Sequence, residues 1–363
     1  MYKKSIEALK KVNRYRERII FDEDIIDLSS NDYLGLAENK KVLKKAYKIV
    51  KKCKSHSPKA SQLVNGYHQI HKNFEDYLCK INNFESGIVV GSGFLANLAL
   101  IETLPRKGDI FIMDEEYHAS GILASKLLSC EVLTFSHNDE KKLENILQTS
   151  NYNRAIVAVE GIYSMHGDLM KREVFEICDK FNAILIVDEA HSSGVVGENL
   201  TGVFEYFNIT PKPNHIKMGT LGKAYGSYGA YILATPQIID FLTNRAKAII
   251  YATAPSLFDI ALAHEGMKQT QKNSKKIVKK IRYIQKLIKQ KLNIDMQGLI
   301  LKIDIGNSLK ALQIKEDLLM NGYSCGAIRP PTVKTAILRI IPRVNTKKRV
   351  LKKFLSFLVE KIH

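Results

Sequence analysis

Short apolar runs alternate with helix-length amphipathic stretches through the middle of the chain. The runs are three to five residues long and mostly uncharged, which is typical of strands buried on both faces of a sheet. The pattern predicts an α/β fold, with a mostly parallel central sheet and helices on both faces. The predicted strands lie at 87–90, 110–113, 131–135, 155–159, 183–187, 216–218 and 230–233.

The pattern changes after about residue 254, which indicates a second, smaller unit. A long basic helix comes first there, followed by apolar runs at 299–303, 323–328 and 336–341 with a helix between the first two. This order favours a small α+β domain. We therefore predict three parts, listed in chain order: an N-terminal extension over 1–45, a large α/β domain over 46–260 and a small C-terminal domain over 261–363.

Composition narrows the class of protein. Of the 363 residues, 45% are hydrophobic, which excludes a disordered chain. No stretch approaches the roughly 20 apolar residues that a membrane span needs, and residues 1–11 do not form a signal-peptide core. These features predict a cytoplasmic protein. The five cysteines are widely spaced without a C-x-x-C pair, so we expect reduced thiols and no metal site.

The chain is strongly basic, with 55 Lys and Arg against 37 Asp and Glu and a net charge of +18. Much of this charge lies in the amphipathic stretches 41–54 and 268–291, as expected of solvated helix faces. An acidic partner, such as a carrier protein that delivers a substrate, is the alternative. Zinc-finger spacing, RNA-recognition motifs and aromatic-rich basic tracts are missing from the sequence, so no nucleic-acid partner is expected.

Polar residues stand where several predicted strands end, which is where open α/β sheets bind ligands. Asp188 follows the strand 183–187 directly, and a carboxylate there needs a cation or several donors. It either caps the next helix or contacts a cofactor. Lys223 follows the strand 216–218 in a glycine-rich loop, where an amine can approach a bound aldehyde closely. Because Ala224 follows Lys223, the loop is not a nucleotide-binding P-loop.

A third strand end carries the glycine-rich turn 91–97, whose free backbone N–H groups at a helix start could hold a phosphate. A phosphate cradle, a carboxylate and a lysine about 35 residues later are what pyridoxal 5′-phosphate requires. Its ring nitrogen needs the carboxylate, and its aldehyde needs the lysine. His118 and Ala190 could lie on the two faces of the ring.

Six motifs together resemble the α-oxoamine synthases, a family of fold-type I, pyridoxal-phosphate-dependent enzymes that join an amino acid to an acyl thioester and release CO2. The resemblance runs from about Arg14 to Arg339. The motifs are SNDYLG at 30–35, LVNGYH at 63–68, SGFLAN at 92–97, EGIYSM at 160–165, DEAH at 188–191 and TLGK at 220–223.

The resemblance implies catalytic roles for three residues. Lys223 would form the Schiff base with the cofactor, Asp188 would pair with the ring nitrogen, and His118 would stack on the ring and donate to the thioester oxygen. It also implies a homodimer with its sites at the interface. The cofactor-binding residues would be Gly93, Phe94, His118, Ser164, Asp188, His191, Thr220 and Lys223, with Thr253 given by the other subunit.

Arg339 resembles the arginine that grips the carboxylate of the amino acid, and Arg16, Asn31 and Thr332 match other substrate-pocket positions. Segment 327–333 (AIRPPTV) most resembles the family member that joins L-alanine to a pimeloyl thioester carried by coenzyme A or by an acyl-carrier protein. Glycine-using members, such as 2-amino-3-oxobutyrate CoA ligase or 5-aminolevulinate synthase, and a catalytically silent binding protein remain alternatives.

Two departures from the family pattern stand out. Gln62 replaces the usual arginine of a Ser-Arg-Leu motif, and segment 333–338 lacks the usual Pro-x-Gly turn and is about two residues shorter. Because the shorter segment directly precedes Arg339, Arg343 is the alternative carboxylate ligand.

The Schiff-base assignment predicts the behaviour of Lys223→Ala. This variant should lose turnover completely while still binding pyridoxal phosphate noncovalently. Borohydride reduction followed by mass spectrometry measures covalent attachment, and attachment that survives in the variant would mean that another lysine is used.

Overall fold

The computed structural model describes residues 2–362, and its centre is a seven-stranded sheet in the order β2-β8-β7-β6-β5-β3-β4. The pairs from β7 through β4 are parallel, whereas β8 runs antiparallel to both β7 and β2. The mostly parallel sheet predicted from the sequence is therefore confirmed. Its strands are β2 (Ser86–Val90), β3 (Ile110–Asp114), β4 (Glu131–Phe135), β5 (Ala155–Glu160), β6 (Ile184–Asp188), β7 (His215–Thr220) and β8 (Ala230–Ala234).

Both faces of this sheet are covered. In β3, Ile110 and Ile112 pack into one apolar cluster, while Phe111 and Met113 pack into another. Successive strand residues point to opposite faces, so the two clusters are the two sides of one sheet. This arrangement explains why the strands read as continuous apolar runs instead of alternating ones.

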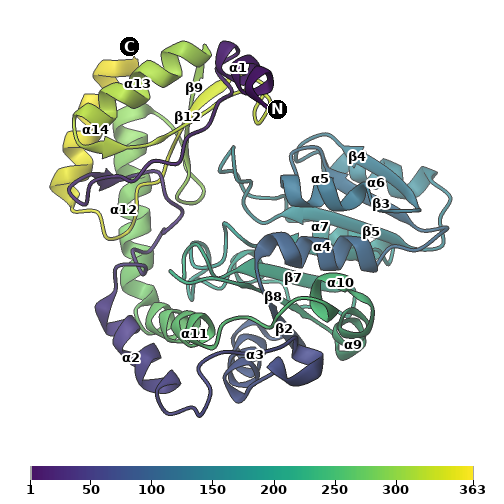
Figure 1. Ribbon diagram of the computed structural model, residues 1–363. Helices are drawn as coiled ribbons and strands as arrows, with labels where there is room; N and C mark the ends of the chain where they lie inside the picture. The colour runs from purple at the N-terminus through teal and green to yellow at the C-terminus, as the bar shows by residue number, and fades with distance from the viewer. Residues whose placement is uncertain (1, 363) are drawn as a thin grey trace.

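Helices form the outer layers (Figure 1). Side chains of α4, α9 and α10 join one cluster, and those of α3, α6, α7 and α11 join the other. The helix α2 packs against α11 at the end of the molecule opposite the N-terminus (Figure 1). The helices of the large lobe and the N-terminal segment are α1 (Lys3–Lys11), α2 (Lys40–Val50), the π-helical turn η1 (Gln62–Gly66), α3 (Gln69–Asn82), α4 (Gly93–Thr103), α5 (Ala119–Ser125), α6 (Glu140–Thr149), α7 (Glu173–Lys180), α8 (Val203–Tyr206), α9 (Pro236–Arg245), α10 (Lys247–Ile250) and α11 (Leu257–Lys272).

The small lobe contains a three-stranded antiparallel sheet in the order β11-β12-β9. The single basic helix expected after residue 254 is two helices, α11 and α12, that meet at Asn273. The apolar run 323–328 is also divided, because β10 pairs with β1 of the N-terminal segment and β11 pairs with β12. The remaining elements are β1 (Ile26–Asp27), α12 (Ser274–Leu292), β9 (Leu301–Gly306), α13 (Ser308–Met320), β10 (Tyr323–Ser324), β11 (Gly326–Ile328), β12 (Ala336–Ile340) and α14 (Lys348–Ile362).

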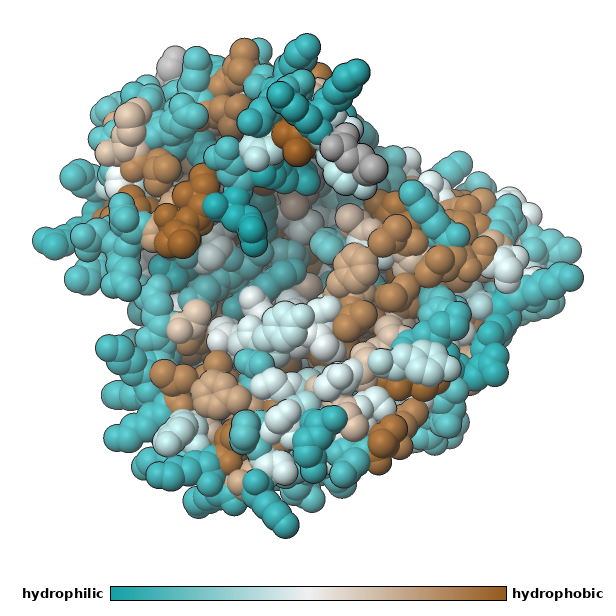
Figure 2. Space-filling view, viewed as in Figure 1, coloured by the Kyte–Doolittle hydropathy of each residue, from teal (hydrophilic) through white to brown (hydrophobic). Residues whose placement is uncertain are grey.

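The surface is hollowed between the two lobes, and hydrophobic side chains gather on the face over α4 and α5 (Figure 2). Among residues 2–362, no helix is long and apolar enough to cross a membrane. The division of the chain at residues 45 and 260 stays a prediction.

A fully buried ion pair lies beside the sheet. The Lys217 Nζ atom of β7 donates to Glu189 Oε1 at 3.2 Å, and both side chains are 0% exposed. Lys217 also donates to the Thr201 carbonyl, while Glu189 accepts the backbone N–H of Val203. Glu189 directly follows Asp188, so this pair anchors the turn that ends β6.

Removing one member of this pair should destabilise the protein strongly. Lys217→Ala leaves the Glu189 carboxylate buried without its cation, which costs about 3–5 kcal/mol. Urea unfolding measures this loss. The matched control is Lys180→Ala, whose exposed pair with Glu144 should contribute nothing measurable.

Candidate active site

A cavity of about 170 Å³ lies at the carboxyl ends of β5, β6 and β7, beside the start of α4. The parallel register places Glu160, Asp188 and Met218 next to one another at this edge. Seven of the predicted cofactor-binding residues line the cavity, and Ser164 and Thr253 do not. The lining residues are Gly93, Phe94, Asn97, His118, Glu160, Asp188, Ala190, His191, Met218, Thr220 and Lys223.

The carboxylate of Asp188 is only 4% exposed. The Asn97 Nδ2 atom donates to Asp188 Oδ2 at 2.9 Å, and the Ala190 backbone N–H donates to Oδ1 at 3.0 Å. A buried carboxylate needs such donors. The sequence analysis gave Asp188 two alternative roles, binding the backbone that follows it or facing a cofactor. The structure is compatible with both, because Asp188 accepts from the Ala190 N–H and also lines the cavity.

Lys223 is the amine of the cavity. Its Nζ atom lies 2.8 Å from His191 Nε2. Burial lowers the pKa of Lys223 to about 8, although the nearby acids Asp188 and Glu160 oppose this shift. A minor but much enlarged fraction of the amine is therefore unprotonated near neutral pH and can attack an aldehyde.

His191 connects Lys223 to the N-terminal segment. Burial and the charge of Lys223 lower the pKa of His191 well below its ordinary value, so the ring is neutral. Its Nε2 atom accepts from Lys223, and its Nδ1–H therefore donates to the Tyr33 hydroxyl at 2.5 Å. Tyr33 in turn donates to Asn31 Oδ1 at 3.3 Å. Burial raises the pKa of Tyr33 to about 12, which keeps the phenol protonated.

The start of α4 and the end of β7 line one side of the cavity, where the sequence analysis predicts a phosphate cradle. An α-helix leaves its first N–H groups without intrahelical acceptors, so those of Gly93 and Phe94 are available to a phosphate. A Cβ atom on Gly93 would lie 3.8 Å from Thr220 Oγ1, so the start of α4 lies directly beside the Thr220 hydroxyl. Gln62 lies nearby, and its Nε2 atom donates to the Val89 carbonyl at 2.7 Å. The residue that departs from the family pattern thus ties η1 to the strand that leads into the cradle.

Glu160 is a buried acid for which the sequence analysis proposed no role. The Ser164 backbone N–H donates to its Oε2 atom at 3.1 Å, whereas Oε1 has no hydrogen-bond partner among the described residues. Burial and the neighbouring Asp188 raise the pKa of Glu160 well above its ordinary value. This shift favours the protonated form of the acid.

The two candidate arginines have different surroundings. Arg339 is buried, and its Nε atom donates to the Ser164 carbonyl at 2.7 Å. Arg343 instead faces carboxylates, with its Nη1 atom 2.8 Å from Glu38 Oε1 and 3.4 Å from Asp32 Oδ2. Since acids already surround Arg343, the geometry favours Arg339 as the ligand of a substrate carboxylate.

Like Arg339 and Asn31, the remaining predicted substrate and partner residues lie outside the lining of the cavity. Arg16 Nη2 donates to Thr332 Oγ1 at 3.5 Å, which joins the N-terminal segment to the 327–333 loop. Thr253 is exposed and forms an isolated bridge with Ser61. The roles assigned to these three residues stay predictions.

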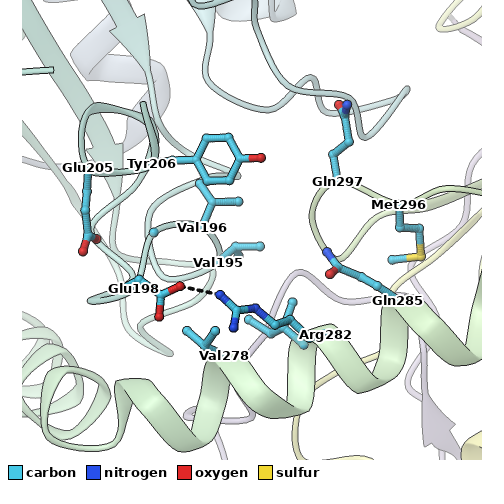
Figure 3. Close-up of a pocket in the computed structure, with 12 residues that line it drawn as sticks. Val195, Val196, Glu198, Glu205, Tyr206, Val278, Arg282, Gln285, Met296 and Gln297 are labelled. Carbon is cyan, nitrogen blue, oxygen red and sulfur yellow. Dashed lines mark hydrogen bonds and ion pairs between the residues drawn. The ribbon is translucent and has the colours of Figure 1, made fainter. Parts of the chain in front are cut away.

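A larger cavity of about 630 Å³ lies between the segment 195–206 and α12 (Figure 3). Its walls mix apolar side chains with charged and amide side chains, and Glu198 and Arg282 of the lining form an ion pair. None of the predicted site residues lines it. The chemistry is concentrated in the smaller cavity.

Asn97, Glu160 and Tyr33 all lie within motifs that the sequence analysis used, yet it assigned them no role. Two of them had a usable signal. Asn97 is a polar residue inside an apolar helix, and Glu160 ends an apolar strand just as Asp188 does. Tyr33 had no such signal, because a buried tyrosine reads as an ordinary core residue.

Comparison with known proteins identifies the family. The sequence model of the family of class I and II aminotransferases matches residues 23–358. The 8-amino-7-oxononanoate synthase of Helicobacter pylori strain J99 is 44% identical over 94% of this chain and 92% of its own length. The chain belongs to the 8-amino-7-oxononanoate synthase family. This finding confirms the resemblance drawn from the sequence motifs.

Solved structures agree with this assignment. The 8-amino-7-oxononanoate synthase from Francisella tularensis superposes with a TM-score of 0.75 at 27% identity, covering 94% of this chain and 97% of its own. A serine palmitoyltransferase from Sphingomonas wittichii has a TM-score of 0.90 at 23% identity, covering 99% and 96% of the two chains. The second likeness shows the fold alone. The fold-type I architecture predicted from the sequence is confirmed.

The residues of the cavity fit pyridoxal phosphate, the cofactor of this family. A carboxylate, an amine of lowered pKa and a helix N-terminus with a hydroxyl beside it converge on one space. The buried Glu160 lies in the same lining with an oxygen that has no partner among residues 2–362. Unsatisfied buried groups of this kind are typical of sites that bind a polar ligand.

The lowered pKa of Lys223 predicts how attachment of the cofactor depends on pH. Only the unprotonated amine attacks the aldehyde, so the attachment rate to the apoprotein should rise with pH and reach half its maximum near pH 8. Stopped-flow absorbance after addition of pyridoxal phosphate gives this rate. A midpoint near 10.5, the ordinary value for a lysine, would contradict the assigned environment.

Proposed function

We propose that this enzyme catalyses the decarboxylative condensation of L-alanine with a pimeloyl thioester, giving 8-amino-7-oxononanoate, CO2 and a free thiol in biotin biosynthesis. The observation that carries this proposal is the convergence of Asp188, Lys223 and the α4 cradle on one cavity. It occurs in a chain that is 44% identical to a curated 8-amino-7-oxononanoate synthase.

Pyridoxal phosphate, when bound, withdraws electrons from Cα of the amino acid, which makes its proton removable and stabilises the charge left by loss of CO2. Asp188 would hold a proton on the ring nitrogen, because its carboxylate is buried and fixed by two donors. Gly93, Phe94 and Thr220 would hold the phosphate. His191 and Ser164 would contact the phenolic oxygen.

Three side chains act on the substrates. Lys223, once displaced by the incoming amino group, removes the Cα proton, a task suited to an amine of lowered pKa. Arg339 binds a carboxylate through its planar guanidinium group. His118 donates a hydrogen bond to the thioester carbonyl oxygen, where negative charge develops as the C–C bond forms and from which it is released as the carbonyl re-forms and the thiol leaves.

The enzyme acts as a homodimer in this proposal, with Thr253 reaching the phosphate site of the partner. Large apolar side chains are exposed on segments next to the cavity, which is typical of a surface that a second copy covers. They are Leu63, Val64, Phe94 and Tyr251. A cytoplasmic location is part of the same proposal.

The substrate assignment predicts a clear preference. With pimeloyl thioester present, L-alanine should give 8-amino-7-oxononanoate and one CO2 per thiol released, while glycine should react at least tenfold more slowly. Mass spectrometry of the product and a thiol assay measure both rates. Faster turnover of glycine with an acetyl or succinyl thioester would assign the chain to another α-oxoamine synthase reaction.

The same assay distinguishes the two acyl carriers. A net charge of +18 would attract either the phosphates of coenzyme A or an acidic carrier protein. Rates with the two thioesters across a salt series identify the carrier. If the rates with both thioesters stay constant across the salt series, electrostatic steering is excluded.

A further inference from the structure

A hydrogen-bond network behind the cavity joins Asp188 to His118. Its members are Tyr117, Asn97 and Ser120, and all three are buried, with exposures of 2%, 1% and 1%. None of them has a role in the reaction described above. The donor and the acceptor of each hydrogen bond in this network can be assigned from the chemistry of the side chains.

Asn97 has only one possible orientation. A carboxylate accepts hydrogen bonds but cannot donate them, so the Asn97 atom 2.9 Å from Asp188 Oδ2 is the amide nitrogen. The Asn97 Oδ1 atom then accepts from the Tyr117 hydroxyl at 2.7 Å. The second amide hydrogen is directed to Ser120 Oγ at 3.0 Å. Both hydrogens and the oxygen of this side chain are therefore used.

This orientation determines the direction of the next bond. Because Ser120 Oγ accepts from Asn97, its own hydrogen is available to His118 Nδ1, which lies 2.6 Å away. The Ser120 backbone N–H also points at Nδ1, at 3.2 Å. With two donors aimed at it, Nδ1 carries no proton. A neutral His118 ring therefore has its hydrogen on Nε2.

The ring is neutral in this setting. Partial desolvation lowers the pKa of His118, and the charge of Lys223 acts in the same direction, while Asp188 opposes them.

Tyr117, at the other end of the network, is held by close packing, because a Cβ atom on Gly121 would lie 2.2 Å from its ring. The absence of a side chain at Gly121 lets the ring pack directly on α5. The far end of the network is thus held by packing.

We propose that Asn97 is a positioning residue that holds the carboxylate of Asp188 and, through Ser120, keeps His118 as the Nε2–H tautomer. One side chain would then orient both the acid that faces the cofactor ring and the histidine that faces the thioester. The proposal rests on the proposed function for the task of His118. The opposite tautomer would present a lone pair, which cannot donate to an oxygen that is gaining negative charge.

The tautomer can be measured without turnover. In holoenzyme labelled with ¹⁵N-histidine, two-bond ¹H–¹⁵N correlation shows which ring nitrogen carries the proton, and the His118→Asn spectrum identifies the signals of His118 among those of the ten histidines. The expected result is a proton on Nε2. A proton on Nδ1 overturns the proposal, whether or not the enzyme uses alanine and a pimeloyl thioester.

A reversal variant tests the part played by Asn97. In Asn97→Asp, an acceptor replaces the amide nitrogen, so the Ser120 hydroxyl turns to donate to residue 97 and no longer donates to His118. The proton of His118 should then move in part to Nδ1, because the Ser120 backbone N–H remains the one donor aimed at that atom. An unchanged tautomer in a folded Asn97→Asp holoenzyme contradicts the role of Asn97.

A milder pair of variants tests the consequence for the reaction. Ser120→Ala removes the hydroxyl donor but keeps the contact between Asn97 and Asp188, so kcat should fall about tenfold, while the affinity for pyridoxal phosphate stays within twofold. Ser125→Ala is the matched control, since its buried hydroxyl in the same helix only donates to the Ile122 carbonyl. A kcat for Ser120→Ala within twofold of the control overturns the proposal.

Discussion

The buried carboxylate of Asp188 is the group on which the rest of the site depends. It ends β6 at a point where the parallel sheet also ends β5 and β7, so Glu160 and Met218 lie beside it in register. A charge in such a place must be stabilised by donors. The side chain of Asn97 and the backbone of Ala190 supply them, and each is held in turn by its own helix or turn.

Burial and the neighbouring Asp188 together shape the electrostatics of the cavity. Burial lowers the pKa of Lys223 and raises that of Glu160, and the proximity of Asp188 adds to the second shift but opposes the first. The result is an acid, Glu160, whose pKa is raised beside an amine, Lys223, whose pKa is lowered to about 8. Such a separation of proton affinities among neighbouring groups is typical of sites that move protons.

The N-terminal segment belongs to the site although it lies far away in sequence. Arg343 of the small lobe binds Asp32 and Glu38 on either side of Tyr33. Strand β1 pairs with β10 just before this segment. Together these contacts insert Tyr33 beside His191. The ion pairs of Arg343 therefore explain both why it is unsuited to bind a substrate and how a remote segment completes the cavity.

The sequence by itself determined the sheet, the order of its strands along the chain and the three strand ends that carry the chemistry. Those features depend on local patterns, since a strand buried on both faces must be apolar and a charge at its end is conspicuous. Only the tertiary structure decided the division of 323–328 between two sheets, the different surroundings of Arg339 and Arg343, and the contacts of Asn97, Ser120, Glu160 and Tyr33. Each of these depends on which distant group lies within hydrogen-bonding distance, and periodicity along one chain carries no information about that distance.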